Sequence, residues 1–460
     1  MANTVNIAKK GDMTKGNVAK LIMLFMLPIM AGNFLQQLYN TVDGIIVGNF
    51  AVQQFSLAAV GTCSSATMLF VSLAVGFCTG GSVVVSQYFG ARKELEMKRS
   101  ISTLLIFSAA FGLLMTVAGV LLSKWLLRVV LCVDAAILPL ANTYMMLYSA
   151  GLVFSFIYNG AAAVLRALGN SSSSLLFLTI SAVANILLDL LFVLVFQWGV
   201  AGAAIATTLS QFISAAASLT YLFKKYGDYL PKGKDFSFDT KLCKIIVKMG
   251  LPNALQMLTV NLSGILMQRL VNGFGALNME AYLAGNRLQN LTSVPIHSIN
   301  SALMSFSAQN TGAGEEKRVK YGMYYTIAMN LAMMLLIIAV VYTFAPQLVS
   351  LFGVSEEAIA LGVEQIRYLV PWMFIFAIYQ PVSGMLRGVG DAAIATSVTL
   401  LTIFVNVTCA YVFVGIIGYA TPWFFVPVSW SCALILACGY YFTGRWKRKA
   451  IVRAPSKQPE

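Results

Sequence analysis

Long apolar segments alternate with short polar connections along almost the whole chain. A membrane-spanning helix needs about 20 mostly apolar residues, and twelve segments of the sequence meet this requirement. In the first half they are 18–47, 54–88, 99–122, 137–165, 173–197 and 200–223; in the second half they are 243–272, 279–309, 321–343, 359–386, 393–417 and 423–444. This pattern predicts an all-α integral membrane protein with twelve transmembrane helices.

Basic residues are distributed unevenly between the connections. The N-terminal segment, every second connection and the C-terminal tail together hold 26 of the 31 lysines and arginines. Cytoplasmic loops of membrane proteins carry such an excess. An even number of spans places both ends on one side, so we expect both termini to be cytoplasmic.

The second half of the sequence repeats the first. Residues 157–170 and 378–391 match in order at a constant offset of 221 positions, which also pairs Asn185 with Asn406. The longest polar connection, 224–241, lies between the halves. We therefore predict an N-lobe (1–223, helices 1–6), a cytoplasmic linker (224–241) and a C-lobe (242–460, helices 7–12 with a basic cytoplasmic tail). Each copy has an even number of spans, so a pseudo-two-fold axis along the membrane normal should relate them.

Composition excludes most other classes of protein. Apolar residues make up 58% of the chain and charged residues only 10%, too few to solvate a soluble protein of this size. The net charge of +14 is dispersed among loops, which argues against a nucleic-acid partner. A single histidine cannot supply the metal-binding motifs of a membrane-embedded enzyme. The sequence also lacks a phosphate-binding Gly-x4-Gly-Lys-Ser/Thr loop, which argues against an ATP-driven pump. We expect no cofactor, no structural metal site, and an ion gradient as the energy source.

The first predicted helix carries a polar stripe. Its members recur every three or four residues and so share one helix face: Asn33, Gln36, Gln37, Asn40 and Asp43. Such a stripe must line water or contact other polar groups. Hydrogen bonds between helices would explain the presence of the amides in the stripe, but they explain the presence of Asp43 less well.

A second acid follows in the fifth predicted helix. Asn185 and Asp189 are four residues apart, hence on one face, and Thr207 in the sixth helix offers a hydroxyl among small residues. A helix end at the membrane interface is the alternative explanation for Asp189. The positions of the second half that are equivalent to Asp43 and Asp189 hold Met267 and Ala410, so these acidic charges are concentrated in the first half. Two carboxylates in a confined apolar pocket repel each other, which favours a site for H+ or for Na+ at Asp43, Asn185 and Asp189.

Further polar and aromatic residues are candidates for substrate contacts. The full predicted set is Gln36, Tyr39, Asn40, Asp43, Tyr158 and Gln256. His297, the single histidine, lies two residues after a proline in an apolar helix and is interpreted as a packed residue.

Taken together, these residues resemble the multidrug and toxic compound extrusion (MATE) family, particularly its bacterial members. The resemblance extends over essentially the whole chain and is carried by these motifs: Leu27-Pro28, 38–44, Val47-Gly48-Asn49, Gln87 through Gly90-Ala91, 166–170, Asn185 with Asp189, and 387–391. It implies that Asp43, Asn159, Asn185, Asp189 and Thr207 form the site of the coupling cation in the N-lobe. Gln256 lies where some members have an acid, which argues against a coupling site in the C-lobe.

The resemblance also implies a function. We expect an antiporter of the bacterial inner membrane, a monomer in contact with membrane lipid, that exports small organic and often cationic compounds in exchange for H+ or Na+ by alternating access. The alternative is a flippase of the same superfamily that moves lipid-linked oligosaccharides. Such proteins need a cationic cavity, whereas the intramembrane charges here are acidic.

Overall fold

The computed structural model describes residues 11–50, 56–233 and 236–452, and within these ranges the secondary structure is helical, without strands. The chain forms α2 (Val18–Phe50), α3 (Ser56–Gly90), α4 (Glu94–Trp125), α5 (Leu138–Ala150), α6 (Leu152–Ala167), α7 (Ser171–Asp189) and α8 (Gly199–Lys225). It continues with α9 (Thr240–Asn272), α10 (Ala276–Gly312), α11 (Glu316–Ser350), α12 (Glu356–Val389), α13 (Ala392–Ile417), α14 (Thr421–Phe424) and α15 (Val426–Phe442). Short π-helical turns, η1 (Leu126–Val130) and η2 (Leu190–Val195), extend α4 and α7.

Each of the twelve predicted segments coincides with one of the long helices or with the α5–α6 pair. Among the described residues, eight helices are by themselves long and apolar enough to cross a membrane, and α5 with α6 forms a further span bent by 43°. Three remain: α9 and α10, which are long but carry more polar residues, and α15, which has only 17 residues. The predicted fold of twelve transmembrane helices is confirmed.

The packing divides the chain into two compact units. The first contains Leu27–Ala254 and the second contains Leu255–Glu460 together with Met13–Met26. We refer to these as the first and second lobes. The division therefore falls within α2 and α9, one residue before Pro28 and two residues after Pro252, rather than in the connection 224–241. The two prolines are equivalent in the repeat, so both copies divide their leading helix in the same way.

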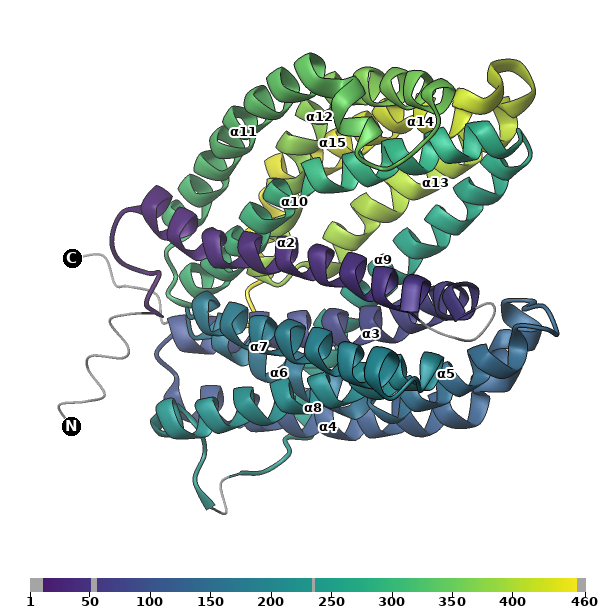
Figure 1. Ribbon diagram of the computed structural model, residues 1–460. Coiled ribbons are helices and arrows are strands. Elements are labelled where there is room, and N and C mark those ends of the chain that lie inside the picture. Colours follow the sequence, from purple (N-terminus) through teal and green to yellow (C-terminus); the bar gives the residue numbers. More distant parts are fainter. Residues whose placement is uncertain (1–10, 51–55, 234–235, 453–460) are drawn as a thin grey trace. The chain divides into compact units, whose positions relative to one another are not determined.

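In the first lobe, α6 lies against α3, α4 and α8 (Figure 1). Glycines allow this close packing: a Cβ atom at Gly112 of α4 would lie 2.7 Å from the Cβ atom of Phe156 on α6. A Cβ atom at Gly160 of α6 would lie 2.6 Å from Oγ of Ser108 on α4. Small residues let membrane helices approach closely, where dispersion replaces the missing hydrophobic driving force.

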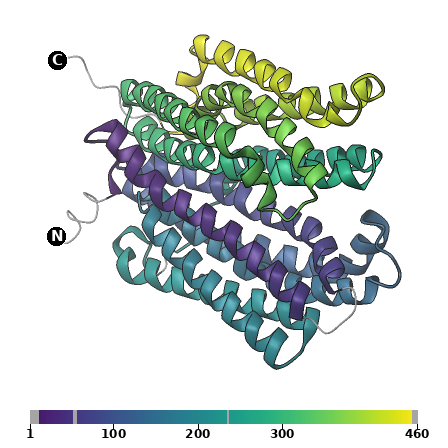
Figure 2. The same cartoon turned by 45° about the horizontal axis from the view of Figure 1, so that its top comes forward.

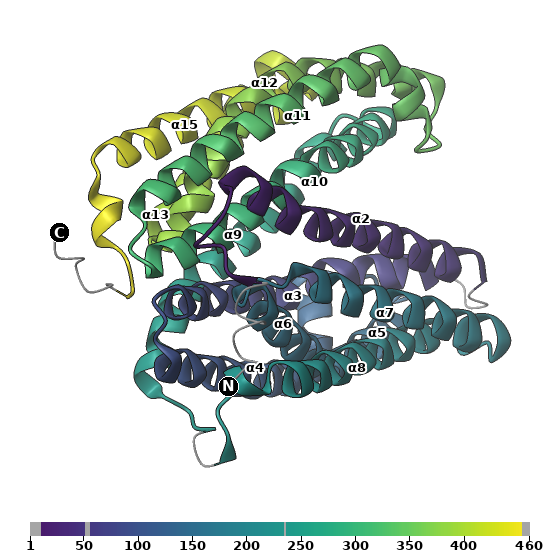
Figure 3. The ribbon, with the colours of Figure 1, turned by 90° about the vertical axis from the view of Figure 1, so that its left-hand side faces the viewer.

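The second lobe repeats this arrangement around α12, which is the counterpart of α6. Helices α10 and α11 pack on α12 and on each other (Figure 3). Helix α15, yellow in Figure 2, runs beside the green α12 and α13. Residues 13–17, which precede α2, also belong to this lobe, and the backbone N–H of Met13 donates to Oε1 of Gln309 at 2.9 Å.

Candidate functional site

Helices α2 and α7 bring the two predicted acids together in the first lobe. The helices are neighbours at Gly32, where a Cβ atom would lie 3.3 Å from Cδ2 of Leu178. Asp43 and Asp189 each lie eleven residues, about three helical turns, beyond that contact. Whole turns return both side chains to the contacting faces, and their carboxyl groups lie within hydrogen-bonding reach of each other.

The pair is enclosed by protein. Asp189 is fully buried, and Asp43 is partly buried. None of the five ion pairs found within the described ranges involves either acid. A hydrogen bond between two carboxyl groups requires a proton on one of them, because two ionised carboxylates have only acceptors. A proton or a small cation shared by the two carboxyl groups would take the place of a basic side chain.

Asn185 and Thr207 support Asp189. With its amide nitrogen turned toward the acid, Asn185 donates to Oδ2 of Asp189 at 2.8 Å and accepts from the backbone N–H of Thr207 at 3.2 Å. The Thr207 hydroxyl donates to the carbonyl of Ala203 at 3.0 Å and lies within hydrogen-bonding distance of the Tyr39 hydroxyl. These contacts connect α2, α7 and α8 and fix the position of the acids.

The acids retain unused acceptor atoms. Within the ranges that the structure describes, Oδ1 of Asp43 and Oδ1 of Asp189 are buried and have no hydrogen-bond partner. Unpaired buried carboxylate oxygens are costly. Together with the amide and hydroxyl oxygens of Asn185 and Thr207, they are the hard oxygen ligands that a small cation such as Na+ prefers.

Tyrosines of α5 form the adjoining wall. Tyr144 and Tyr148 are buried, and their rings stack with centroids 6.0 Å apart. The Tyr148 hydroxyl lies within hydrogen-bonding distance of Gln211 of α8, four residues after Thr207. Sequence reasoning did not single out Gln211, although its spacing from Thr207 places both on one helix face. The aromatic faces can attract an organic cation beside the acid pair.

The remaining predicted residues have other surroundings. Asn159 donates its amide to the Ser155 carbonyl of its own helix at 2.8 Å, and Tyr158 beside it is partly buried. Gln36 is exposed on α2, two turns before Asp43. Gln256 belongs to the second lobe, where it accepts a hydrogen bond from Arg387 at 2.6 Å. The side chain of Asn40 lies outside the described residues.

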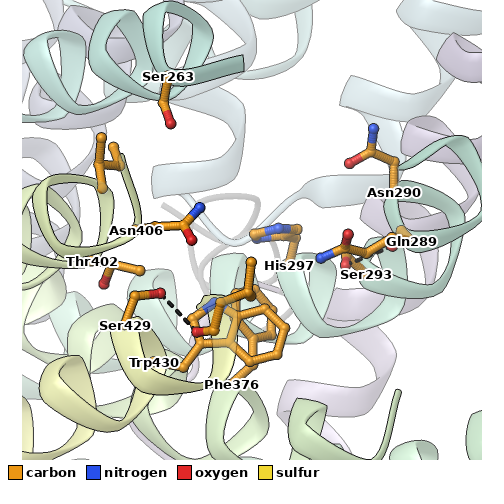
Figure 4. A pocket seen from close by; sticks show the side chains of 12 residues that line it. Ser263, Gln289, Asn290, Ser293, His297, Phe376, Thr402, Asn406, Ser429 and Trp430 are labelled. Carbon is orange, nitrogen blue, oxygen red and sulfur yellow. Dashed lines mark hydrogen bonds between the residues drawn. The ribbon is translucent and has the colours of Figure 1, made fainter. Parts of the chain in front are cut away.

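A second cluster of polar side chains lies within the second lobe and was not predicted as a site. It surrounds a cavity of about 280 Å³. Figure 4 shows His297 and Asn406 directed into this cavity. The interpretation of His297 as an ordinary packed residue was therefore incomplete, because its ring packs edge-on against Phe376 at 5.5 Å and also lines the cavity.

Comparison with known proteins agrees with this architecture. The family model MatE matches residues 28–191 and 252–412, one segment in each half of the chain. This protein is a member of the MATE family. The curated "Probable multidrug resistance protein YpnP" of Bacillus subtilis is 29% identical over 448 residues, which cover 95% of this chain and 98% of that protein. YoeA of the same organism, also a probable multidrug resistance protein, is 28% identical over 455 residues, 96% of each chain.

Solved structures of MATE transporters have the same fold. The crystal structure of MATE in complex with MaL6 superimposes with a TM-score of 0.89 and 26% identity, covering 96% of this chain and 99% of that one. The protein is thus a multi-pass membrane transporter related to multidrug efflux proteins. The MATE matches fall on both halves of the repeat, as the sequence led us to expect.

Proposed function

We propose that this MATE transporter is an antiporter that exports small organic, often cationic, compounds in exchange for H+ or Na+ by alternating access. One observation carries the proposal: the carboxyl groups of Asp43 and Asp189 lie within hydrogen-bonding reach of each other inside the first lobe. Within the described part of the chain, no ion pair neutralises them. Intramembrane acids of this kind mark ion pathways.

The coupling follows from the shared charge. When a proton or Na+ occupies the pair, the first lobe offers little attraction to an organic cation. When the ion leaves, the negative charge and the stacked Tyr144 and Tyr148 attract that cation. The two ligands therefore weaken each other's binding, and this effect is reciprocal by linkage.

Asn185 and Thr207 position the acids in this mechanism, and Asn159 is a further candidate ligand of the coupling ion. Gln36, Tyr39, Asn40, Tyr158 and Gln256 remain proposed substrate contacts. We further propose that the protein lies in the bacterial inner membrane as a monomer, with both termini cytoplasmic, as its basic residues indicate.

The alternative of a flippase for lipid-linked oligosaccharides is not favoured. A pyrophosphate group needs a cationic cavity, whereas the intramembrane charge cluster of the first lobe is acidic. The full-length relatives reported above are named for multidrug resistance, which agrees with export of organic compounds.

Reconstituted protein tests the proposal. Purified transporter is reconstituted into liposomes, and the liposomes are loaded with ethidium. The ethidium flux across the membrane is measured under an imposed pH gradient and then under a Na+ gradient. We expect one gradient to drive flux in the wild type, and Asp43→Asn and Asp189→Asn each to abolish the driven component.

Asp228→Asn is the matched control, because it also removes one negative charge from the first lobe. Asp228 is half exposed and forms a 3.9 Å surface pair with Lys232, which contributes little. The driven ethidium flux of the Asp228→Asn variant should equal that of the wild type. Driven flux at the wild-type rate in both Asp43→Asn and Asp189→Asn would contradict the proposal.

A further inference from the structure

The second lobe contains a group of polar side chains that the proposed ion coupling does not use. The cavity described above has a volume of about 280 Å³ and is lined by residues of α9, α10, α12, α13 and α15. Its polar members are Ser263, Gln289, Asn290, Ser293, His297, Thr402, Asn406 and Ser429. Polar groups at this depth in a membrane protein must face water, a ligand or one another.

The cavity is lined by three carboxamide side chains, those of Gln289, Asn290 and Asn406. Within the described residues, no hydrogen bond joins the side chains of Gln289, Asn290 and Asn406, and Oδ1 of Asn406 is buried without a partner. By contrast, the hydroxyls of Ser293 and Ser429 donate to carbonyls of their own helices at 2.8 Å and 2.7 Å (Figure 4). The unused carboxamides offer both donors and acceptors to a ligand.

The sequence repeat explains the chemistry of this cavity. Asn406 is the counterpart of Asn185, which supports Asp189 in the first lobe. The counterparts of Asp189 and Asp43 are Ala410 and Met267, both buried. The second lobe therefore has the amide but neither acid. Among the described residues, those that line its cavity include no Asp, Glu, Lys or Arg.

One side of the cavity is aromatic. The Phe376 ring lies 5.5 Å from His297 and 5.3 Å from Trp430, and all three line the cavity. Aromatic rings of a ligand pack favourably against such a wall in offset or edge-on arrangements. The cavity volume lies just below the range of about 300–1,000 Å³ for drug-sized pockets, so it suits one ring system.

We propose that this cavity is a second binding site, specific for an uncharged planar ring that carries both a hydrogen-bond donor and an acceptor, such as a lactam or an imide. A cation finds no carboxylate among the lining residues to replace its water, and Arg387, the arginine near His297, does not line the cavity and donates to Gln256 at 2.6 Å. A lactam edge matches the carboxamides of Gln289 and Asn406, and its ring matches Phe376 and Trp430. The two lobes then select ligands of different charge.

Equilibrium binding to purified protein tests this site. Isothermal titration calorimetry compares three bicyclic probes of similar size: neutral 2-quinolone, cationic N-methylquinolinium and anionic quinoline-2-carboxylate. We expect saturable binding of 2-quinolone with one site, and at least tenfold weaker binding of the two charged probes to that site.

Variants locate the site. Asn406→Leu and Gln289→Met remove a carboxamide at nearly constant volume and should each weaken 2-quinolone binding three- to tenfold, the loss expected for a hydrogen bond. Ile403→Trp fills the cavity from its apolar wall and should abolish binding even if a carboxamide variant fails to fold. The matched control is Asn278→Leu, since Asn278 lies on α10 outside the cavity and bonds the Phe274 carbonyl of its own chain.

The proposal is independent of the coupling ion, because Asp43 and Asp189 lie in the other lobe. Asp189→Asn protein should bind 2-quinolone like the wild type even where its driven transport is lost. Three results would overturn the site: no saturable binding of 2-quinolone, equal binding of the cationic probe, or unchanged binding in the Ile403→Trp variant.

Discussion

A carboxylic acid inside a membrane helix is tolerated when its neighbours satisfy it, and Asp189 shows how this is done. With the Asn185 amide nitrogen turned toward it, its Oδ2 accepts from Asn185 at 2.8 Å, and its carboxyl group lies within hydrogen-bonding reach of Asp43. Asn185 is itself held by the backbone N–H of Thr207. This chain of contacts fixes the acid while leaving Oδ1 of both acids unused within the described residues.

At this scale we expect Asn185→Leu to slow driven ethidium flux about tenfold. The substitution keeps the volume and removes a donor to a charged acceptor, which is worth about 1.5–3 kcal/mol. Flux in proteoliposomes at matched protein content measures the effect. Asn142→Leu is the control, because it loses a 3.0 Å hydrogen bond with Ser123 away from the acids. A similar loss of driven ethidium flux in both variants would contradict a specific role of Asn185 in supporting Asp189.

The single-residue level also shows where sequence reasoning succeeds and where it stops. Four-residue spacing put Asn185 and Asp189 on one face, and the structure brings them to Asp43. Spacing cannot reveal which partner a long side chain selects: Gln256 bonds Arg387, more than a hundred residues away in the chain.

The cavity of the second lobe had a sequence signal that was overlooked. Gln289, Ser293 and His297 recur every four residues on α10 and therefore share a face. Asn406 was recognised only as the repeat partner of Asn185. The cavity needs residues from five helices, and their convergence depends on tertiary packing that periodicity does not encode.

Among the helices, the contact between α3 and the first part of α9 uses small residues on both sides. Gly76 and Gly80 on α3 face Gly250 and Ala254 on α9, each pair separated by four positions. A Cβ atom at Gly80 would lie 2.3 Å from the backbone nitrogen of Gly250, and one at Gly76 would lie 2.4 Å from the Cα atom of Ala254. This is the small-x3-small pattern of closely packed membrane helices, and it accounts for the assignment of residues up to Ala254 to the first lobe.

We therefore expect Gly80→Ala to destabilise the protein by about 1–3 kcal/mol, since the added methyl group meets backbone that cannot rotate away. The apparent melting temperature of purified protein, followed by size-exclusion chromatography after heating, checks this. Gly61→Ala on the same helix is the control, because a Cβ atom there meets nothing within 4 Å. It should be neutral or slightly stabilising, as alanine favours helix more than glycine does. Equal melting temperatures for the two variants would contradict the close contact.

Sequence patterns identified the helices well, because apolar length is a strong signal in membrane proteins. The bend between α5 and α6 was missed: the segment 137–165 was predicted as one span, and it contains a 43° bend at Gly151. A Cβ atom at Gly151 would lie 2.7 Å from the Thr208 side chain. The close approach of α8 thus explains why glycine is needed at the bend, which no local pattern shows.

For the molecule as a whole, the distribution of basic residues predicts which side each connection occupies. Cys132 is exposed in the connection between α4 and α5, which should face the outside. We expect a membrane-impermeant maleimide to label Cys132 in intact cells, or in spheroplasts if the cell has an outer membrane, and Cys132→Ser to lose this labelling. In a Cys132→Ser background, Ser237→Cys in the connection between α8 and α9 should react only after lysis. Labelling of both positions from outside would contradict the orientation.

The central claim is that a positive ion leaves the Asp43–Asp189 pair when substrate binds. The most direct measurement is ion release from purified transporter in weakly buffered detergent solution, followed with a pH-sensitive dye and, in parallel, a Na+ electrode, on addition of ethidium. We predict that the wild type releases one of the two ions in proportion to bound ethidium and that the Asp43→Asn, Asp189→Asn double variant releases neither. Ethidium binding without release of either ion, or equal release from the double variant, would show that the acids do not couple the two ligands.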